Sequence, residues 1–280
     1  MIPSLAPTAP PAHDLAAAAA AVQRDGITGL PGAFDPGWIH RLREDFDVLF
    51  TEAGSRPDGT VSRGPHRYYF AVPPERVRGF AELVTHPAVT GLSELLLGPE
   101  WTAVELGFDV PLPGAVDQPW HRDFPMPADT RDSGVLTSLA FNVSAVTVTP
   151  QMGPLEIVPG SQWEDGADFE DGMFPPPERA PGYATRARPR LPAIGDASAR
   201  TGLAVHRGTA NRSGTARPVL ILGVVAPHVD TSGAHDLVLT RRYAATLPAT
   251  VRDHLRCTDL VEELVPMPQR HDIEGLKMGG

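Results

Sequence analysis

The sequence has little cysteine, no long apolar run and no excess of basic residues, and each shortage excludes a class of protein. Cys257 is the single cysteine of 280 residues, so an internal disulfide framework and a cysteine-rich zinc site are excluded. The longest apolar run, 219–227, has the length of a strand, whereas a membrane span needs about 18 residues or more. Lys and Arg total 24 against 34 Asp and Glu, for a formal charge of -10. We therefore expect neither a membrane protein nor a nucleic-acid-binding protein.

The chain is long enough to bury a sizeable core in one domain. Residues 1–12 are rich in proline and alanine and lack the basic residues that open a signal peptide, so we predict a flexible tail and a cytoplasmic protein. A single domain is predicted for 13–280. Its predicted parts are a helical N-terminal part at 13–100, a β core at 101–227 and a C-terminal extension at 228–280.

The hydrophobic pattern changes near Trp101. Before it, Asp14 is a plausible N-cap for a helix to Arg24, and apolar residues recur at helical spacing over 36–50. After it, short strand-like runs alternate with Gly and Pro turns, which is typical of a sandwich, jelly roll or barrel. The predicted strands are 102–110, 118–123, 135–146, 153–158, 203–206 and 219–225. We therefore predict a mainly β fold with flanking helices, in which the long loop 164–192 is either a lid or a solvated surface loop.

His121 and Asp123 form a His-x-Asp pair at the end of one predicted strand. Side chains at i and i+2 of a strand share a face, so the imidazole and the carboxylate project together. Alone the pair is a weak signal, because it occurs by chance in many proteins. His206, at the end of another apolar run, is the best candidate for a third ligand. Two histidines and one carboxylate on one face of a metal are typical of non-haem Fe(II) oxygenases.

Arg217 follows His206 across a strong turn signal at 211–214. If the turn reverses the chain, Arg217 lies on the strand that neighbours His206. A guanidinium there could hold a carboxylate with two parallel hydrogen bonds, as a 2-oxoacid bound to iron would require. A surface ion pair is the alternative, which we rank lower because apolar strand residues follow directly.

A third motif, Gly153 and Leu155 followed by the turn Pro159–Ser161, carries no catalytic side chain but completes a pattern. With His121, Asp123, His206, Asn211 and Arg217 at this spacing, most of 22–227 resembles the phytanoyl-CoA dioxygenase family of Fe(II)/2-oxoglutarate oxygenases. The resemblance implies a double-stranded β-helix (jelly-roll, cupin-like) core. It also implies Fe(II) held by the three ligands, with dioxygen and 2-oxoglutarate as co-substrates and the distal carboxylate of 2-oxoglutarate on Arg217.

The resemblance further implies oxidation of a small organic molecule, with hydroxylation as the leading outcome and desaturation, epimerisation or ring chemistry as others. Related halogenases have Gly or Ala in place of the carboxylate, so the presence of Asp123 argues against halogenation. The composition is compatible with bacterial specialised metabolism. Two alternatives stay open: a cupin-like isomerase or hydrolase that uses the triad without 2-oxoglutarate, and a non-catalytic relative.

The sequence departs from the family at Gly208, where some relatives have a hydroxyl residue that helps to hold 2-oxoglutarate. Thr209 and Thr137 are the two candidates to supply that hydroxyl. Arg122, between two ligands, is expected to point outward, away from the metal. The candidates for substrate contact, for which core packing is at least as good an explanation, are Arg67, Tyr68, Tyr69, Phe108, Phe124 and Trp163.

Overall fold

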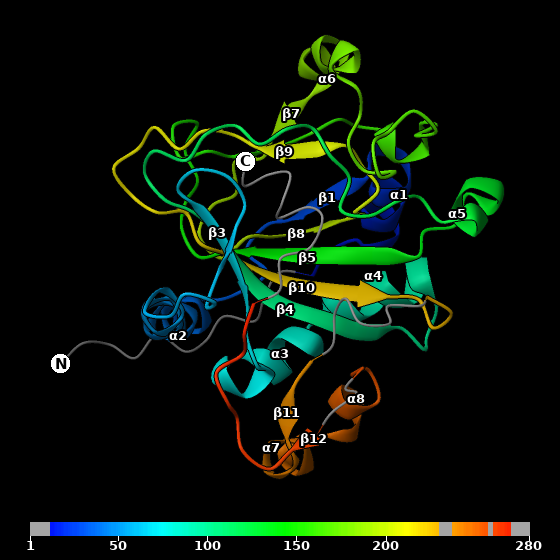
Figure 1. The fold of residues 1–280 in the computed structure, drawn as a ribbon. Helices are drawn as coiled ribbons and strands as arrows, with labels where there is room; N and C mark the ends of the chain where they lie inside the picture. Colours follow the sequence, from blue (N-terminus) through cyan, green and yellow to red (C-terminus); the bar gives the residue numbers. More distant parts are fainter. Residues whose placement is uncertain (1–11, 230–236, 257–259, 270–280) are drawn as a thin grey trace.

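The structure is a computed structural model that describes residues 12–229, 237–256 and 260–269. Two antiparallel β-sheets form its centre (Figure 1). The large sheet has seven strands in the order β1-β8-β5-β10-β4-β3-β2, and the small sheet has three in the order β7-β6-β9. The large-sheet strands are β1 (Ile27–Leu30), β2 (Val61–Ser62), β3 (Arg67–Ala71), β4 (Thr102–Pro111), β5 (Ser138–Ser144), β8 (Ala197–Arg200) and β10 (Val219–Val225). The small-sheet strands are β6 (Leu155–Ile157), β7 (Arg188–Pro189) and β9 (His206–Gly208). This confirms the predicted β core with flanking helices.

The two faces of the large sheet differ in chemistry because side chains alternate along each strand. On β5, Leu139, Phe141 and Val143 belong to the main hydrophobic core, whereas Asn142 lines a cavity that faces the small sheet. Opposite Asn142 on β10 stands Ile221, which lines the same cavity. The apolar face therefore holds the core, and the other face is free to carry polar groups.

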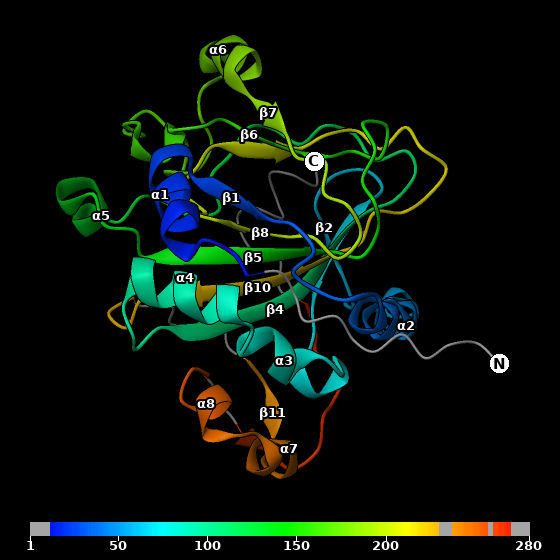
Figure 2. The same ribbon diagram turned by 180° about the vertical axis from the view of Figure 1, so that it is seen from behind.

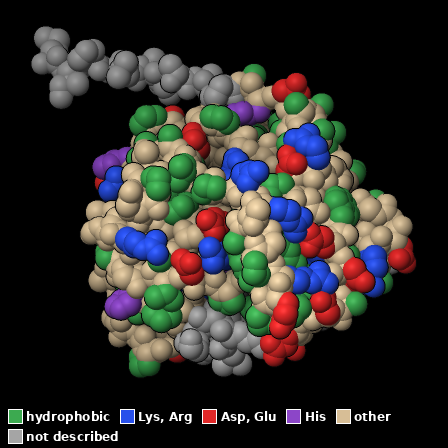
Figure 3. Space-filling view, turned by 90° about the horizontal axis from the view of Figure 1, so that it is seen from above, with side chains coloured by type: hydrophobic (Ala, Val, Ile, Leu, Met, Phe, Trp, Pro, Cys, Tyr) green, Lys and Arg blue, Asp and Glu red, His purple; other side chains and the backbone are tan. Residues whose placement is uncertain are grey.

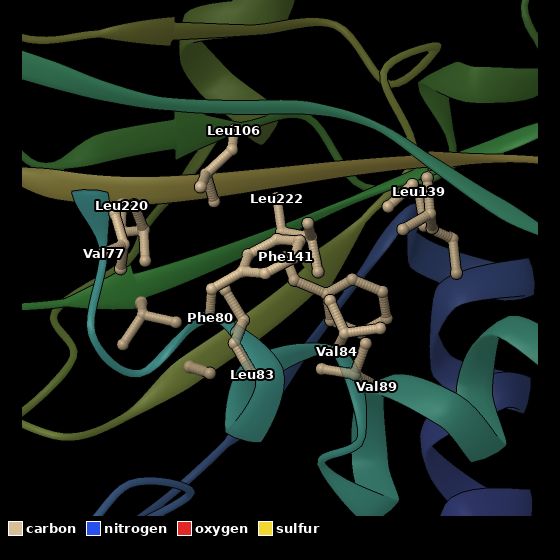
Figure 4. Close-up of a cluster of buried hydrophobic side chains, with 14 of the residues drawn as sticks. Val77, Phe80, Leu83, Val84, Val89, Leu106, Leu139, Phe141, Leu220 and Leu222 are labelled. Atoms are coloured by element: carbon tan, nitrogen blue, oxygen red, sulfur yellow. The ribbon is translucent and has the colours of Figure 1, made fainter. Parts of the chain in front are cut away.

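Helices cover the apolar face. In Figures 1 and 2, α3 (Phe80–Val84) and α4 (Pro87–Leu97) lie on the side of the large sheet opposite to the small one. Figure 4 shows side chains from both helices, among them Phe80 and Val89, packed against Phe141 and Leu222 of the sheet. Burial of a side chain of this size contributes about 1.5–3 kcal/mol, so this cluster is a main source of stability.

The first two helices begin where the sequence predicts, and the second runs on to Gly54, beyond its predicted end at residue 50. Asp14 caps α1 (Leu15–Asp25) by accepting from Ala17 N, and Gly26 ends it at φ 79°. Asp35 caps α2 (Pro36–Gly54) in the same way. The residues of α2 predicted at helical spacing are all buried: Trp38, Ile39, Leu42, Phe46 and Leu49. Further short helices before the C-terminal segment are η1 (Pro74–Arg76), α5 (Ala128–Ser133), η2 (Ser161–Trp163), η3 (Pro177–Arg179) and α6 (Ala180–Arg186).

The large sheet takes strands from outside the predicted β core. β1, β2 and β3 come from 13–100, the stretch predicted as the helical part. By contrast, the predicted strand 118–123 is reduced to an isolated bridge between His121 and His206. Sheet pairing between segments far apart in the chain decides both differences, because short runs have little strand preference of their own.

The C-terminal segment packs on the same core. It contains β11 (Leu239–Thr240), α7 (Arg241–Thr246), α8 (Ala249–Arg252) and β12 (Leu260–Val261). Leu239, Leu247 and Val251 are part of the main hydrophobic cluster. In the described part of the chain, no helix combines the length and apolar character that crossing a membrane requires. The predicted tail, apart from residue 12, and Cys257 lie outside the described residues.

Candidate metal and co-substrate site

His121, Asp123 and His206 meet between the two sheets. One ligand atom from each lies within 4.8 Å of the others, and among the described residues they are the one such group of His, Cys, Asp or Glu side chains. Backbone hydrogen bonds join the two histidines, from His121 N to His206 O at 3.0 Å and from His206 N to His121 O at 2.9 Å. Asp123 N donates to Gly202 O at 2.8 Å, which fixes the third member beside the same segment. The main chain therefore holds the three residues of the triad together.

Both imidazoles are oriented by backbone carbonyls. His121 Nδ1 lies 2.8 Å from Pro119 O, and His206 Nδ1 lies 2.8 Å from Ala204 O. Each Nδ1 then carries the proton, which leaves Nε2 as the free lone pair that a metal ligand needs. Burial and the neighbouring His206 hold the pKa of His121 well below its usual value, so its imidazole is neutral. This donor set fits Fe(II).

Arg200, at the end of β8, contacts the carboxylate of the triad. Its Nη1 lies 2.6 Å from Asp123 Oδ2, while Asp123 Oδ1 lies 3.2 Å from His206 Nε2. Burial alone would raise the pKa of Asp123, but the charge of Arg200 and the contact with His206 hold it well below the usual range. The aspartate is thus ionised, with one oxygen held by the arginine and the other turned toward the histidines.

Arg200 is absent from the predicted site. The only sequence signal for it is the alternation Ala197-Ser198-Ala199-Arg200, which places the arginine on one face of a short strand. Its contact with Asp123 joins positions 77 residues apart, so the pairing of β8 with β5 must be known first.

The triad opens into a cavity of about 70 Å³. A second space of about 310 Å³ adjoins it toward β1 and shares Asn142, Leu155, Arg217 and Val219 with it. The smaller cavity is lined by Arg63, Arg67, Tyr69, Asp109, Gln118, His121, Asp123, Asn142, Leu155, Arg200, His206, Arg217, Val219 and Ile221. Four of these residues are arginines and two are aspartates, so the lining favours an anionic ligand.

Arg217 lines both spaces, but its predicted position was wrong in one respect. It precedes β10 of the large sheet, whereas His206 belongs to β9 of the small sheet. The predicted turn is present, because Asn211 Nδ2 donates to Pro111 O at 3.0 Å and to Thr215 O at 2.9 Å. After that turn the chain crosses between the sheets, so Arg217 and His206 face the cavity from opposite sides. Burial and the charge of Arg67, opposed by Asp109, lower the pKa of Arg217 to about 10.

Neither threonine predicted to replace the missing hydroxyl lines the cavity. Thr137 lies one residue before β5, where its carbonyl accepts from Ala226 N, at the end of the strand away from Asn142. Alternation also gives it the same side as Leu139 and Phe141, which pack in the core. Thr209 Oγ1 donates to Pro154 O at 2.8 Å, so this hydroxyl is already committed.

The predicted substrate contacts separate into two groups. Arg67 and Tyr69 line the cavity, and Tyr68 between them belongs to the other face of β3. Phe108 is fully buried against Phe46 and Phe70 in the core.

The other two aromatic candidates lie outside the cavity lining. Phe124 is half-buried beside Gly202. Trp163 is 38% exposed and donates to Gln23 O on α1 at 2.9 Å, at the outer surface. Because side chains alternate along β3 and β4, Tyr68 and Phe108 face away from the cavity, whereas the adjacent Arg67, Tyr69 and Asp109 line it.

Arg122 points away from the metal, as predicted, but it is buried rather than outward. Its Nη2 donates to Ser161 O at 2.9 Å and to Glu164 O at 2.7 Å, and its guanidinium lies 4.7 Å from the centre of the Phe169 ring. It thereby fixes the start of the long segment 164–192. Tyr183 of that segment packs in a cluster with Trp120, so part of the segment is packed on the small sheet and is not a loose surface loop.

The chain matches the family described as phytanoyl-CoA dioxygenase (PhyH) over residues 22–219. This match spans well over half of the sequence. The chain belongs to the phytanoyl-CoA dioxygenase family. Within the match lie the three triad residues and Arg217, and it begins in the first helix.

One characterised relative is an L-proline trans-4-hydroxylase of Streptomyces griseoviridis, 28% identical over 170 residues. That alignment covers 56% of this chain and 58% of the relative, so the two are similar over little more than half of their lengths.

Solved structures share the fold at lower identity. AviO1 from Streptomyces viridochromogenes Tue57 has a TM-score of 0.59 at 22% identity, covering 78% of this chain and 97% of that one. The epimerase SnoN, in complex with Fe3+, alpha ketoglutarate and nogalamycin RO, has a TM-score of 0.61 at 22% identity over 76% and 83% of the two chains. The carbocyclase SnoK from nogalamycin biosynthesis has a TM-score of 0.62 at 18% identity over 75% and 83%. These likenesses bear on the fold.

Proposed function

We propose that this member of the family is a non-haem Fe(II)- and 2-oxoglutarate-dependent dioxygenase that hydroxylates a small organic molecule in bacterial specialised metabolism. The observation that supports it most is the placement of the triad and Arg217 around one cavity. A 2-oxoacid can span that cavity, with its keto-acid end at the metal and its distal carboxylate at the arginine. An isomerase that uses the metal alone would have no need of the arginine.

When bound, iron and dioxygen supply the oxidation, in which 2-oxoglutarate becomes succinate and carbon dioxide and the substrate gains one oxygen atom. The chain itself supplies orientation and charge. The carbonyls of Pro119 and Ala204 turn each Nε2 toward the metal, and Arg200 holds the aspartate. Such contacts behind metal ligands set ligand orientation and basicity.

The relatives support the choice of substrate class. By their names, one hydroxylates L-proline and another closes a carbocycle in nogalamycin biosynthesis, and both substrates are small molecules. A cytoplasmic site of action is part of the proposal, since a reducing compartment suits a chain with one cysteine.

The test is anaerobic titration of the Fe(II) protein with 2-oxoglutarate, read by a weak visible charge-transfer band. We expect the band in the wild type and in His40→Ala, a control at an exposed histidine, and its loss in His121→Ala. A substrate panel read by succinate release then identifies the substrate. A wild type with neither band nor succinate would refute the proposal. Turnover that survives Arg217→Ala would favour the cupin-like alternative.

A further inference from the structure

Arg67 opens β3 and is buried in the cavity wall with an exposed fraction of 3%. It forms a two-pronged ion pair with Asp109 of β4, from Nε to Oδ1 at 3.1 Å and from Nη2 to Oδ2 at 2.9 Å. Its third nitrogen, Nη1, is buried and has no hydrogen-bond partner among the described residues. Leaving a charged donor buried and unmatched is costly, so this nitrogen indicates a missing acceptor.

Arg217 reaches the same carboxylate. Its Nη2 lies 3.7 Å from Asp109 Oδ2, and its Nε is buried with no partner in the described part of the chain. Arg67 and Arg217 share the one carboxylate of Asp109, so this trio of side chains carries a net positive charge, to which the nearby Arg63 adds. Burial and the charge of Arg67 lower the pKa of Arg217 to about 10, as expected where two cations share one counter-ion. One further carboxylate would neutralise the group.

Gly208 makes room for the guanidinium of Arg67. A Cβ at this position would come within 1.8 Å of Arg67 Nη1, so the guanidinium fills the space that any side chain at 208 would need. Gly208 is two residues after His206, on the same face of β9. Arg67 therefore extends from the large sheet across to the strand of the metal ligand. It stands where a hydroxyl residue is expected in some relatives.

We propose that Arg67 and Arg217, held side by side by Asp109, bind the distal carboxylate of 2-oxoglutarate together. This inference rests on the proposed function and adds a second arginine to the co-substrate site. Gly208 has a definite role in it, because the absence of a side chain there admits the second guanidinium. A carboxylate on the organic substrate is the other possible source of the same chemistry, and the experiment separates the two.

The experiment measures direct binding to the Mn(II)-loaded protein by tryptophan fluorescence, with no turnover. We expect Arg67→Met to raise the Kd of 2-oxoglutarate about tenfold or more, the usual effect of removing a hydrogen bond to a charged group. The Kd of 2-oxobutyrate, which lacks the distal carboxylate, should not change. Arg207→Met is the matched control. Arg207 is on the same strand as Gly208, is ion-paired with Glu156 of β6 and lies outside the cavity lining.

Substitution at Gly208 gives an independent arm. Gly208→Ala should displace Arg67 and raise the Kd of 2-oxoglutarate with Arg67 still present. In the double variant Arg67→Met/Gly208→Ser, the new hydroxyl should recover part of the affinity for 2-oxoglutarate that Arg67→Met alone loses. If Arg67→Met does not fold, Arg67→Lys keeps one charge without the two-pronged geometry, and we expect a smaller rise in Kd.

Three outcomes would overturn the proposal. The first is an unchanged Kd for 2-oxoglutarate together with a higher KM for the organic substrate, which would assign Arg67 to the substrate. The second is an equal loss for 2-oxoglutarate and 2-oxobutyrate, which would indicate a purely structural role. The third is tight binding in Gly208→Ala. Failure of the proposed function is a different result, namely no 2-oxoglutarate binding to the wild-type protein.

Discussion

Arg200 and Asp123 share a short ion pair on the side of the carboxylate that faces away from the other ligands. The distance from Arg200 Nη1 to Asp123 Oδ2 is 2.6 Å, and Arg200 is 6% exposed. With Oδ2 held in this way, Oδ1 alone is turned toward the histidines. The pair therefore favours an aspartate that offers one oxygen to a metal.

Arg200→Met should weaken Fe(II) binding about 10- to 100-fold, which is the usual effect of removing a partner behind a metal ligand. The aspartate would lose its fixed orientation and most of the charge that keeps it ionised. Anaerobic Fe(II) titration measures the change. Arg188→Met, at an exposed arginine, is the control. Wild-type affinity in Arg200→Met would contradict the positioning role.

Asp109→Asn should destabilise the protein by about 3 kcal/mol at pH 7, because it leaves two buried arginines without their counter-ion. Burial alone would raise the pKa of Asp109, but Arg67, Arg217 and Arg63 together lower it. Its contribution is then fully present above the unfolded pKa of about 3.9 and is lost as pH falls through the folded pKa. Urea unfolding should show a constant difference from wild type between about pH 5 and 7 that shrinks below about pH 4. A constant difference at all pH values would argue against the ion pair.

The affinity for 2-oxoglutarate should be independent of pH near neutrality and fall as pH rises through about 10, the pKa of Arg217 in the free protein. Below that pH the guanidinium is charged and can hold a carboxylate; above it, binding must take up a proton. Titrations of the metal-loaded protein between about pH 8 and 11 measure this. 2-Oxobutyrate serves as the control ligand, and its affinity should not follow the same titration.

Phe108→Ala should cost stability and leave the site intact. Phe108 is fully buried between Phe46 and Phe70, so truncation should lower the free energy of unfolding by about 3–5 kcal/mol. The Kd of 2-oxoglutarate in the folded variant should stay at the wild-type value. A shifted Kd at wild-type stability would return Phe108 to the list of ligand contacts.

Arg122→Met should loosen the segment that follows the small sheet. The substitution leaves the carbonyls of Ser161 and Glu164 without their buried donor and removes the cation from the Phe169 ring. We expect faster hydrogen exchange over 161–174 in this variant than in Arg186→Met, measured by mass spectrometry. Arg186→Met is the control, because Arg186 pairs with the side chain of Glu164 at a more exposed position than the buried Arg122. Equal exchange in the two variants would show that Arg122 does not hold the segment.

The predictions from sequence succeeded where the information is local. The cap Asp14, the apolar spacing of α2 and the turn at Asn211 depend on neighbours within a few residues, and all are present. The two histidines and Asp123 were identified because a short motif and a distant histidine fit one coordination chemistry, and the structure brings them together.

The rest depends on pairing between distant strands. Arg200 and Asp123 are 77 residues apart, and Arg67 and Asp109 are 42 apart. Nothing in the spacing of these residues predicts that they meet, because the partner of a strand and its register decide which side chains become neighbours. For the same reason, the sequence predicted Arg217 on a strand beside His206, whereas the structure places it across the cavity from His206.

The alternation of side chains along the large sheet divides each strand into positions that face the cavity and positions that pack in the core. Asn142 faces the cavity while Phe141 and Val143 hold the core, and on β4 Asp109 stands next to Phe108. A lineage could exchange the cavity-facing positions one at a time to accept a new substrate, and the fold would tolerate the change because the packed positions stay as they are. In this architecture, substitutions at cavity-facing positions can change the substrate specificity, while the fold depends on the core-facing positions beside them.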